Sequence, residues 1–120
     1  MTSVIPSLFF ETFLIEKRIP YQIEPHANLV IYIIERTIRH GKYVGTTVTI
    51  GLPIPSDFEA NPPYGLHIKK EHGVIQNITK SGVSLLGDQW EFWSRQVKNW
   101  DIAVNKSQYY LDHVDRWLEL

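Results

Sequence analysis

The sequence predicts a single α+β domain, in which an N-terminal helix and a C-terminal helix flank an antiparallel meander sheet. Three observations support this fold class. Both ends of the chain carry apolar residues at helical spacing, the middle carries segments that alternate at strand spacing, and the length of 120 residues suits one core. No internal repeat or linker divides the chain, so residues 1–120 are expected to form one domain.

The first predicted element is a short helix. Ser7 is a suitable N-cap, and Pro20 is expected to stop the helix because proline cannot continue an α-helical hydrogen-bond ladder. Between them, Leu8, Phe9 and Phe13 belong to a broad apolar face. The segment therefore predicts a helix that packs against the rest of the domain.

The first two predicted strands differ in pattern. Residues 29–34 are apolar on both faces, which predicts a central strand covered on each side, whereas the preceding residues 24–28 are rich in turn formers. The polar residues 35–39 lead to a hairpin at positions 40–41. Residues 44–50 then alternate, with Val48 and Ile50 on one face, which is typical of a half-buried antiparallel strand.

A proline-rich segment interrupts the sheet. Four of the seven prolines lie between positions 53 and 63, which predicts a rigid extended loop because proline cannot donate to a strand ladder. A third strand starts at Tyr64, with Leu66 and Ile68 facing inward and His67 facing away from the core. Residues 71–81 show weak periodicity and predict a loop that crosses an exposed face.

The last third of the chain contains an aromatic cluster and a helix. The spacing of Trp90, Phe92 and Trp93 fits either a strand or a helix, so periodicity leaves this segment open. A helix is expected to start with Asn105 or Ser107 as its N-cap and to run to the C-terminus. Its apolar residues recur at helical spacing: Tyr110, Leu111, Val114, Trp117 and Leu118.

Composition excludes several classes of function. The formal net charge is -1 and no dense stripe of Lys and Arg is present, so nucleic acid is a poor candidate partner. The first residues lack a basic signal-peptide region and no apolar run is long enough to span a bilayer, which predicts a cytoplasmic protein without membrane contact. The glycines do not gather into a phosphate loop, and the five histidines lack metal-site spacing, so no cofactor or metal is predicted.

Two segments resemble the active-site region of ubiquitin-conjugating enzymes. Residues 54–63, IPSDFEANPP, resemble the proline loop in which a proline and an aromatic residue precede a Pro-Pro pair. Residues 76–85, QNITKSGVSL, resemble the crossing that carries a His-Pro-Asn motif and then the catalytic cysteine. Only Asn77 of that motif is retained, and Ser84 or Leu85 occupies the place of the cysteine.

A closer resemblance is to the prokaryotic conjugating-enzyme-like family usually labelled family E. Residues 86–95, LGDQWEFWSR, followed by Trp100 and the Tyr110-Leu111 pair, are similar to that family's ordered pattern, and the likeness covers about the last two-thirds of the chain. The resemblance implies the ubiquitin-conjugating (UBC-like) fold. It also implies a role in a prokaryotic ubiquitin-like modification pathway, with a ubiquitin-like protein or an activating-enzyme-like protein as partner.

The chain contains no cysteine, so it cannot carry a modifier as a thioester. The first hypothesis is therefore a non-catalytic domain that binds a ubiquitin-like protein or its activating enzyme noncovalently. A second hypothesis is an enzyme that accepts the modifier as an oxyester on Ser84, although the sequence places no recognisable histidine or carboxylate base beside it. A third hypothesis is a scaffold or dimerisation domain unrelated to ubiquitin-like proteins. This hypothesis is compatible with a homo-oligomer.

The candidate site residues follow from these hypotheses. Ser84 is the candidate nucleophile, and Asn77 is a candidate oxyanion donor or a residue that bridges loop backbone groups. Aromatic and proline residues near the motifs either fill the core or contact a partner. This candidate partner-binding set is Phe58, Pro62, Pro63, Tyr64, Trp90 and Trp93.

Overall fold

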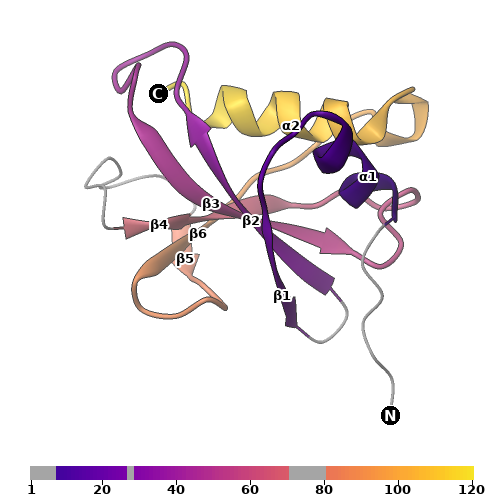
Figure 1. Cartoon of the computed structure of the whole chain (residues 1–120), viewed down its shortest axis with the longest axis horizontal. Coiled ribbons are helices and arrows are strands. Elements are labelled where there is room, and N and C mark those ends of the chain that lie inside the picture. Colours follow the sequence, from indigo (N-terminus) through magenta and orange to yellow (C-terminus); the bar gives the residue numbers. More distant parts are fainter. Residues whose placement is uncertain (1–7, 27–28, 71–80) are drawn as a thin grey trace.

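One antiparallel sheet of six strands, covered on one face by two helices, makes up the domain in the computed structural model (Figure 1). The structure describes residues 8–26, 29–70 and 81–120. The elements in chain order are α1 (Leu8–Glu16), β1 (Gln22–His26), β2 (Leu29–Thr37), β3 (Thr47–Pro55), β4 (Gly65–Lys69), β5 (Ser81–Val83), β6 (Trp90–Ser94), the 3₁₀ helix η2 (Trp100–Ile102) and α2 (Lys106–Trp117). Within these ranges, no helix is long and apolar enough to cross a membrane.

The strand order is β1-β2-β3-β4-β6-β5, and every neighbouring pair is antiparallel. The first four strands form a meander, after which β6 pairs with β4 and leaves the short strand β5 at the edge. The predicted α+β class, the antiparallel meander and the helix at each end are thereby confirmed.

The main core lies between the sheet and the helices. Every second residue of the central strands points to this side, including Tyr32 on β2 and Leu52 on β3, because side chains alternate across a strand. Phe10 of α1 is fully buried and lies 5.3 Å, ring centre to ring centre, from Tyr32 and 6.0 Å from Tyr110 of α2. These aromatic contacts join both helices to the sheet.

Both predicted helices are present. Asn105 is the N-cap of α2, since its side-chain oxygen accepts a hydrogen bond from the Gln108 N–H at 3.2 Å, which decides between Asn105 and Ser107. The α1 helix ends at Glu16, before Pro20. The expected N-cap of α1, Ser7, lies outside the described residues.

Two predictions about the strands were wrong. Residues 22–26 form strand β1, although their Pro25 suggested a turn; β1 lies at the edge of the sheet, where a missing N–H is tolerated. Strand β3 begins at Thr47 rather than at position 44 and continues through Pro53 to Pro55. In the described residues, β3 pairs with β4 only at Ile50 and Gly51. Beyond Gly51, the side of β3 that faces β4 therefore needs no backbone N–H donor, and prolines can be part of the strand there.

The structure also settles the region after β4. The predicted loop at 71–81 lies outside the described residues except for Ser81, which belongs to strand β5. The aromatic cluster, which fitted either a strand or a helix, forms strand β6, since Trp90 to Ser94 pair in register with β4. Gly65 at the start of β4 has φ +146°, and a Cβ there would collide with the Trp93 carbonyl oxygen, so both conformation and space require glycine.

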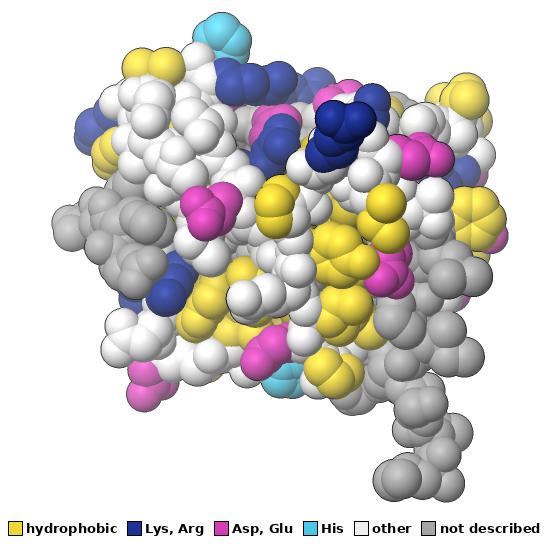
Figure 2. Space-filling model, viewed as in Figure 1, with side chains coloured by type: hydrophobic (Ala, Val, Ile, Leu, Met, Phe, Trp, Pro, Cys, Tyr) yellow, Lys and Arg dark blue, Asp and Glu magenta, His cyan; other side chains and the backbone are white. Residues whose placement is uncertain are grey.

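An ion pair joins the far end of α2 to the sheet. The Arg36 guanidinium donates from Nε and Nη2 to the two carboxylate oxygens of Asp115, at 3.0 and 2.6 Å. Asp115 is 5% exposed, and Arg39 approaches the same carboxylate at 3.8 Å. Figure 2 shows Lys and Arg side chains gathered over the side of the molecule where α2 lies. The nearly buried carboxylate of Asp115 therefore connects α2 to Arg36 of β2 and to Arg39 in the segment after it.

Candidate functional site

Ser84 lies in the turn that joins β5 to β6. Its Oγ is 2.7 Å from Nδ1 of His67 on β4 and accepts the Leu86 backbone N–H at 3.0 Å. The backbone closes the turn, because the Gly87 N–H donates to the Ser84 carbonyl at 3.2 Å. The Ser84 hydroxyl is thus held by two hydrogen bonds, to a side chain of β4 and to a backbone group of its own turn.

The prediction for His67 was half right. The residue lies on the sheet face opposite Leu66 and Ile68, as the alternation predicted, but this face is also covered there, because His67 is only 3% exposed. The β5–β6 turn and the ring of Phe92, 4.8 Å from the imidazole, contribute to this burial. The expectation that no histidine lies near Ser84 was also wrong, because the fold brings together two residues 17 positions apart.

The same turn is seated on the sheet through Leu86. A Cβ built at Gly51 of β3 would lie 2.9 Å from Leu86 Cδ1 and 2.9 Å from Ile31 Cγ2. Glycine therefore leaves the space into which the leucine packs. We call residues 84–87, with Ser84 bonded to His67 and Leu86 over Gly51, the seated turn.

Electrostatics favour a neutral imidazole in this pair. Burial, with a smaller contribution from the nearby His26, lowers the pKa of His67 to about 4. Either the Ser84 hydroxyl donates to Nδ1, or Nδ1–H donates to Oγ, and both arrangements leave Oγ free to accept the Leu86 N–H. Ser84 is 5% exposed, so its oxygen is poorly placed to reach a reacting group of another molecule.

The candidate partner-binding residues separate into two groups. Phe58 and Trp93 are 2% and 0% exposed, and Pro63 is also buried, so they belong to the interior. Tyr64 is 61% exposed, and Pro62 and Trp90 are partly exposed, so only these three offer surface to another molecule. The second candidate site residue, Asn77, lies outside the described residues.

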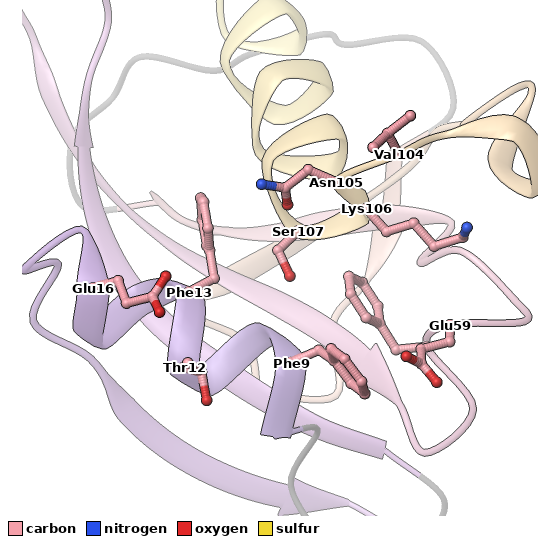
Figure 3. Close-up of a pocket in the computed structure, with 10 residues that line it drawn as sticks. Phe9, Thr12, Phe13, Glu16, Glu59, Val104, Asn105, Lys106 and Ser107 are labelled. Carbon is pink, nitrogen blue, oxygen red and sulfur yellow. The ribbon is translucent and has the colours of Figure 1, made fainter.

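A groove that the sequence did not predict lies on the helix side of the domain. One wall is a stripe of α1 at helical spacing, Phe9, Thr12, Phe13 and Glu16, and the other consists of the residues around the start of α2 and the turn after β3 (Figure 3). The hollow measures about 650 Å³. A sequence signal existed: α1 carries more apolar residues than one buried face can use, and Phe9 is left 62% exposed.

Among the described residues, no three His, Cys, Asp or Glu side chains come together as a metal site would require. No protein-family model, curated protein or solved structure matches the chain. The class that the fold and site define is thus an α+β domain with a buried serine–histidine contact and an open groove between its helices. The resemblance to conjugating enzymes is one of sequence motifs alone.

Proposed function

We propose that this protein is a non-catalytic, UBC-like domain of a prokaryotic ubiquitin-like modification pathway. In this role it binds a ubiquitin-like protein, or the enzyme that activates it, without forming a covalent bond. The observation that carries the proposal is the absence of cysteine from a chain that otherwise resembles conjugating enzymes.

The surroundings of Ser84 support a role without chemistry. Its hydroxyl is buried, contacts His67 at 2.7 Å and accepts the Leu86 N–H, so it satisfies polar groups of the turn. An acyl acceptor must instead present its oxygen to an incoming carbonyl. The Ser84 position thus contributes to the fold, and the exposed surface is left to recognise partners.

Binding can be tested with the ubiquitin-like protein encoded beside the gene, if one is present, by isothermal titration calorimetry. The proposal expects saturable heat with the wild type and weaker binding by Tyr64→Ala, because Tyr64 is the most exposed of the candidate aromatic residues. Absence of heat at high micromolar concentrations with both the ubiquitin-like protein and its activating enzyme would sink the proposal. A gene neighbourhood without either protein favours the scaffold hypothesis instead.

A second candidate function follows from the His67 contact. The neutral His67 lies 2.7 Å from Ser84 Oγ, within reach to take its proton if Oγ is uncovered in place and attacks a modifier thioester on the activating enzyme. A C–O bond then forms, the C–S bond breaks, and the proton passes to the departing thiolate. Such a step yields an oxyester on Ser84.

Mass spectrometry separates the two functions. After incubation with activating enzyme, ATP and modifier, the non-catalytic proposal expects no adduct on the wild type. An adduct that disappears in Ser84→Ala and weakens in His67→Asn would establish the oxyester function. An adduct that survives Ser84→Ala unchanged excludes Ser84 as the acceptor.

A further inference from the structure

The groove between α1 and the start of α2 combines an apolar floor with acidic ends. Phe13 and Phe58 are buried at its base, and Phe9 forms an apolar lip. Figure 3 shows Glu16 and Glu59 on opposite sides of the hollow. Both carboxylates are exposed, and neither has a hydrogen bond or ion pair to another described residue.

The single cation at the rim among the lining residues does not neutralise them. Lys106 donates from Nζ to the Ala103 carbonyl at 3.1 Å and lies over the ring of Trp100, 5.9 Å from its centre. Its Nζ thus has its contacts on the 3₁₀ segment and forms no ion pair with either carboxylate, although Figure 3 shows Lys106 on the same side of the hollow as Glu59. The groove therefore presents apolar surface flanked by two negative charges.

The exposure of the lip adds a second observation. Phe9 is 62% and Val104 101% exposed, and Ile102 nearby on η2 is 73% exposed. Single exposed apolar residues are ordinary. Here, however, Phe9 and Val104 line one hollow, and Ile102 lies two positions before Val104 in the chain. Covering Phe9 and Val104 would remove apolar surface from water.

We propose that this groove binds a segment of a partner protein in which an apolar side chain is flanked by Lys or Arg. The apolar side chain packs against Phe9 at the lip, above the nearly buried rings of Phe13 and Phe58, and the flanking cations pair with Glu16 and Glu59. The proposal builds on the proposed binding role but not on the identity of the partner. It holds equally for a segment carried by a protein unrelated to ubiquitin.

A display experiment tests the recognition without knowing the partner. A phage library of random peptides is selected on the wild-type protein, with counter-selection on Phe9→Asp, which alters the lip of the groove and leaves buried residues in place. The proposal expects enriched peptides with Leu, Ile, Phe or Trp next to Lys or Arg. Enrichment of acidic peptides, or no enrichment above an unrelated protein, would overturn it.

Charge reversal tests the acidic ends. One selected basic peptide is synthesised with a fluorescent label, together with a copy in which Glu replaces Lys and Arg, and binding is followed by anisotropy. Glu16→Lys with Glu59→Lys is expected to weaken the basic peptide by about tenfold and to strengthen the acidic copy. The matched control is Glu35→Lys, an exposed glutamate on the opposite sheet face, which should change neither affinity.

Two outcomes distinguish the alternatives. Equal affinities in the charge-reversed and wild-type proteins exclude recognition by Glu16 and Glu59. A wild-type dimer in sedimentation that becomes monomeric in Phe9→Asp, with no peptide bound, assigns the groove to a second copy of the chain and overturns the proposal. If the wild-type protein shows no calorimetric binding to a ubiquitin-like protein but keeps its preference for basic peptides, the result rejects the proposed pathway and leaves the groove proposal standing.

Discussion

The two faces of the sheet are covered in different ways. On one face, two helices supply a continuous aromatic and aliphatic core that includes Phe10 and Tyr110. On the other, described cover comes from the seated turn, held by the hydrogen bond between Ser84 and His67 and by Leu86 over Gly51. The first face depends on buried apolar area, and the second depends on one polar contact and one close steric fit.

The difference shows that one buried polar side chain can hold a short turn against a sheet. The motif resemblance places a catalytic cysteine at Ser84 or Leu85, and the hydroxyl of Ser84 helps to hold a turn against the sheet. A hydroxyl is well suited to this task because it can donate and accept at once. The predictions below separate the contributions of the two faces.

The largest effect is expected on the helix-covered face. Phe10→Ala removes a fully buried ring that contacts Tyr32, Phe58 and Tyr110, and should lower the free energy of unfolding by about 3–5 kcal/mol. Urea denaturation measures this change in the free energy of unfolding. The matched control, Phe9→Ala, lies on the same helix but is 62% exposed, and should cost less than about 1 kcal/mol. Equal losses of stability in Phe10→Ala and Phe9→Ala would contradict the assignment of Phe10 to the core.

The next effect tests the ion pair at the end of α2. Arg36→Ala leaves the carboxylate of Asp115 nearly buried without its bidentate partner, and should cost about 2–3 kcal/mol in the same assay. Arg39→Ala is the control, because its approach to Asp115 is 3.8 Å and its side chain is half exposed. A greater loss for Arg39→Ala than for Arg36→Ala would contradict the assignment.

On the helix-free face, the fit of Leu86 over Gly51 predicts a coupled pair of substitutions. Gly51→Ala places a methyl group 2.9 Å from Leu86 Cδ1 and should cost about 1–3 kcal/mol. Leu86→Ala alone removes packing, but it frees space for the new methyl group. The double variant should therefore lose less stability than the sum of the two single variants, and strict additivity would show that the two residues do not touch.

The smallest effect concerns pH and separates the polar contact from the apolar core. Burial lowers the pKa of His67 to about 4, below the value near 6.5 of an unfolded histidine, so the unfolded chain binds more protons between those values. The stability from neutral His67 is fully present above about pH 6.5 and falls as the pH drops, by about 1–2 kcal/mol near pH 5.

The control variant is His67→Asn, which retains a polar side chain beside Ser84 but does not titrate. The difference in unfolding free energy between wild type and variant should therefore change over this pH range. A constant difference would mean that folding does not shift the pKa of His67.

Alternation and helical spacing predicted much of the fold. The helix at 106–117, the faces of Val48 and Ile50, and the inward side of Leu66 and Ile68 all follow from residue order. The edge strand β1 and the prolines within β3 did not, because whether a missing N–H matters depends on whether a neighbouring strand needs it. The candidate site was predicted in part: Ser84 was singled out, but its histidine was not.

The sequence by itself determined that this chain folds as α+β and that no thioester can form on it, because strand and helix periods are local and cysteine is absent. Only the tertiary structure decided that His67 is buried against Ser84, that Phe58 and Trp93 are interior, and that α1 and α2 leave a groove. The physical reason is that periodicity assigns a side chain to a face, whereas distant segments of the chain decide what covers that face.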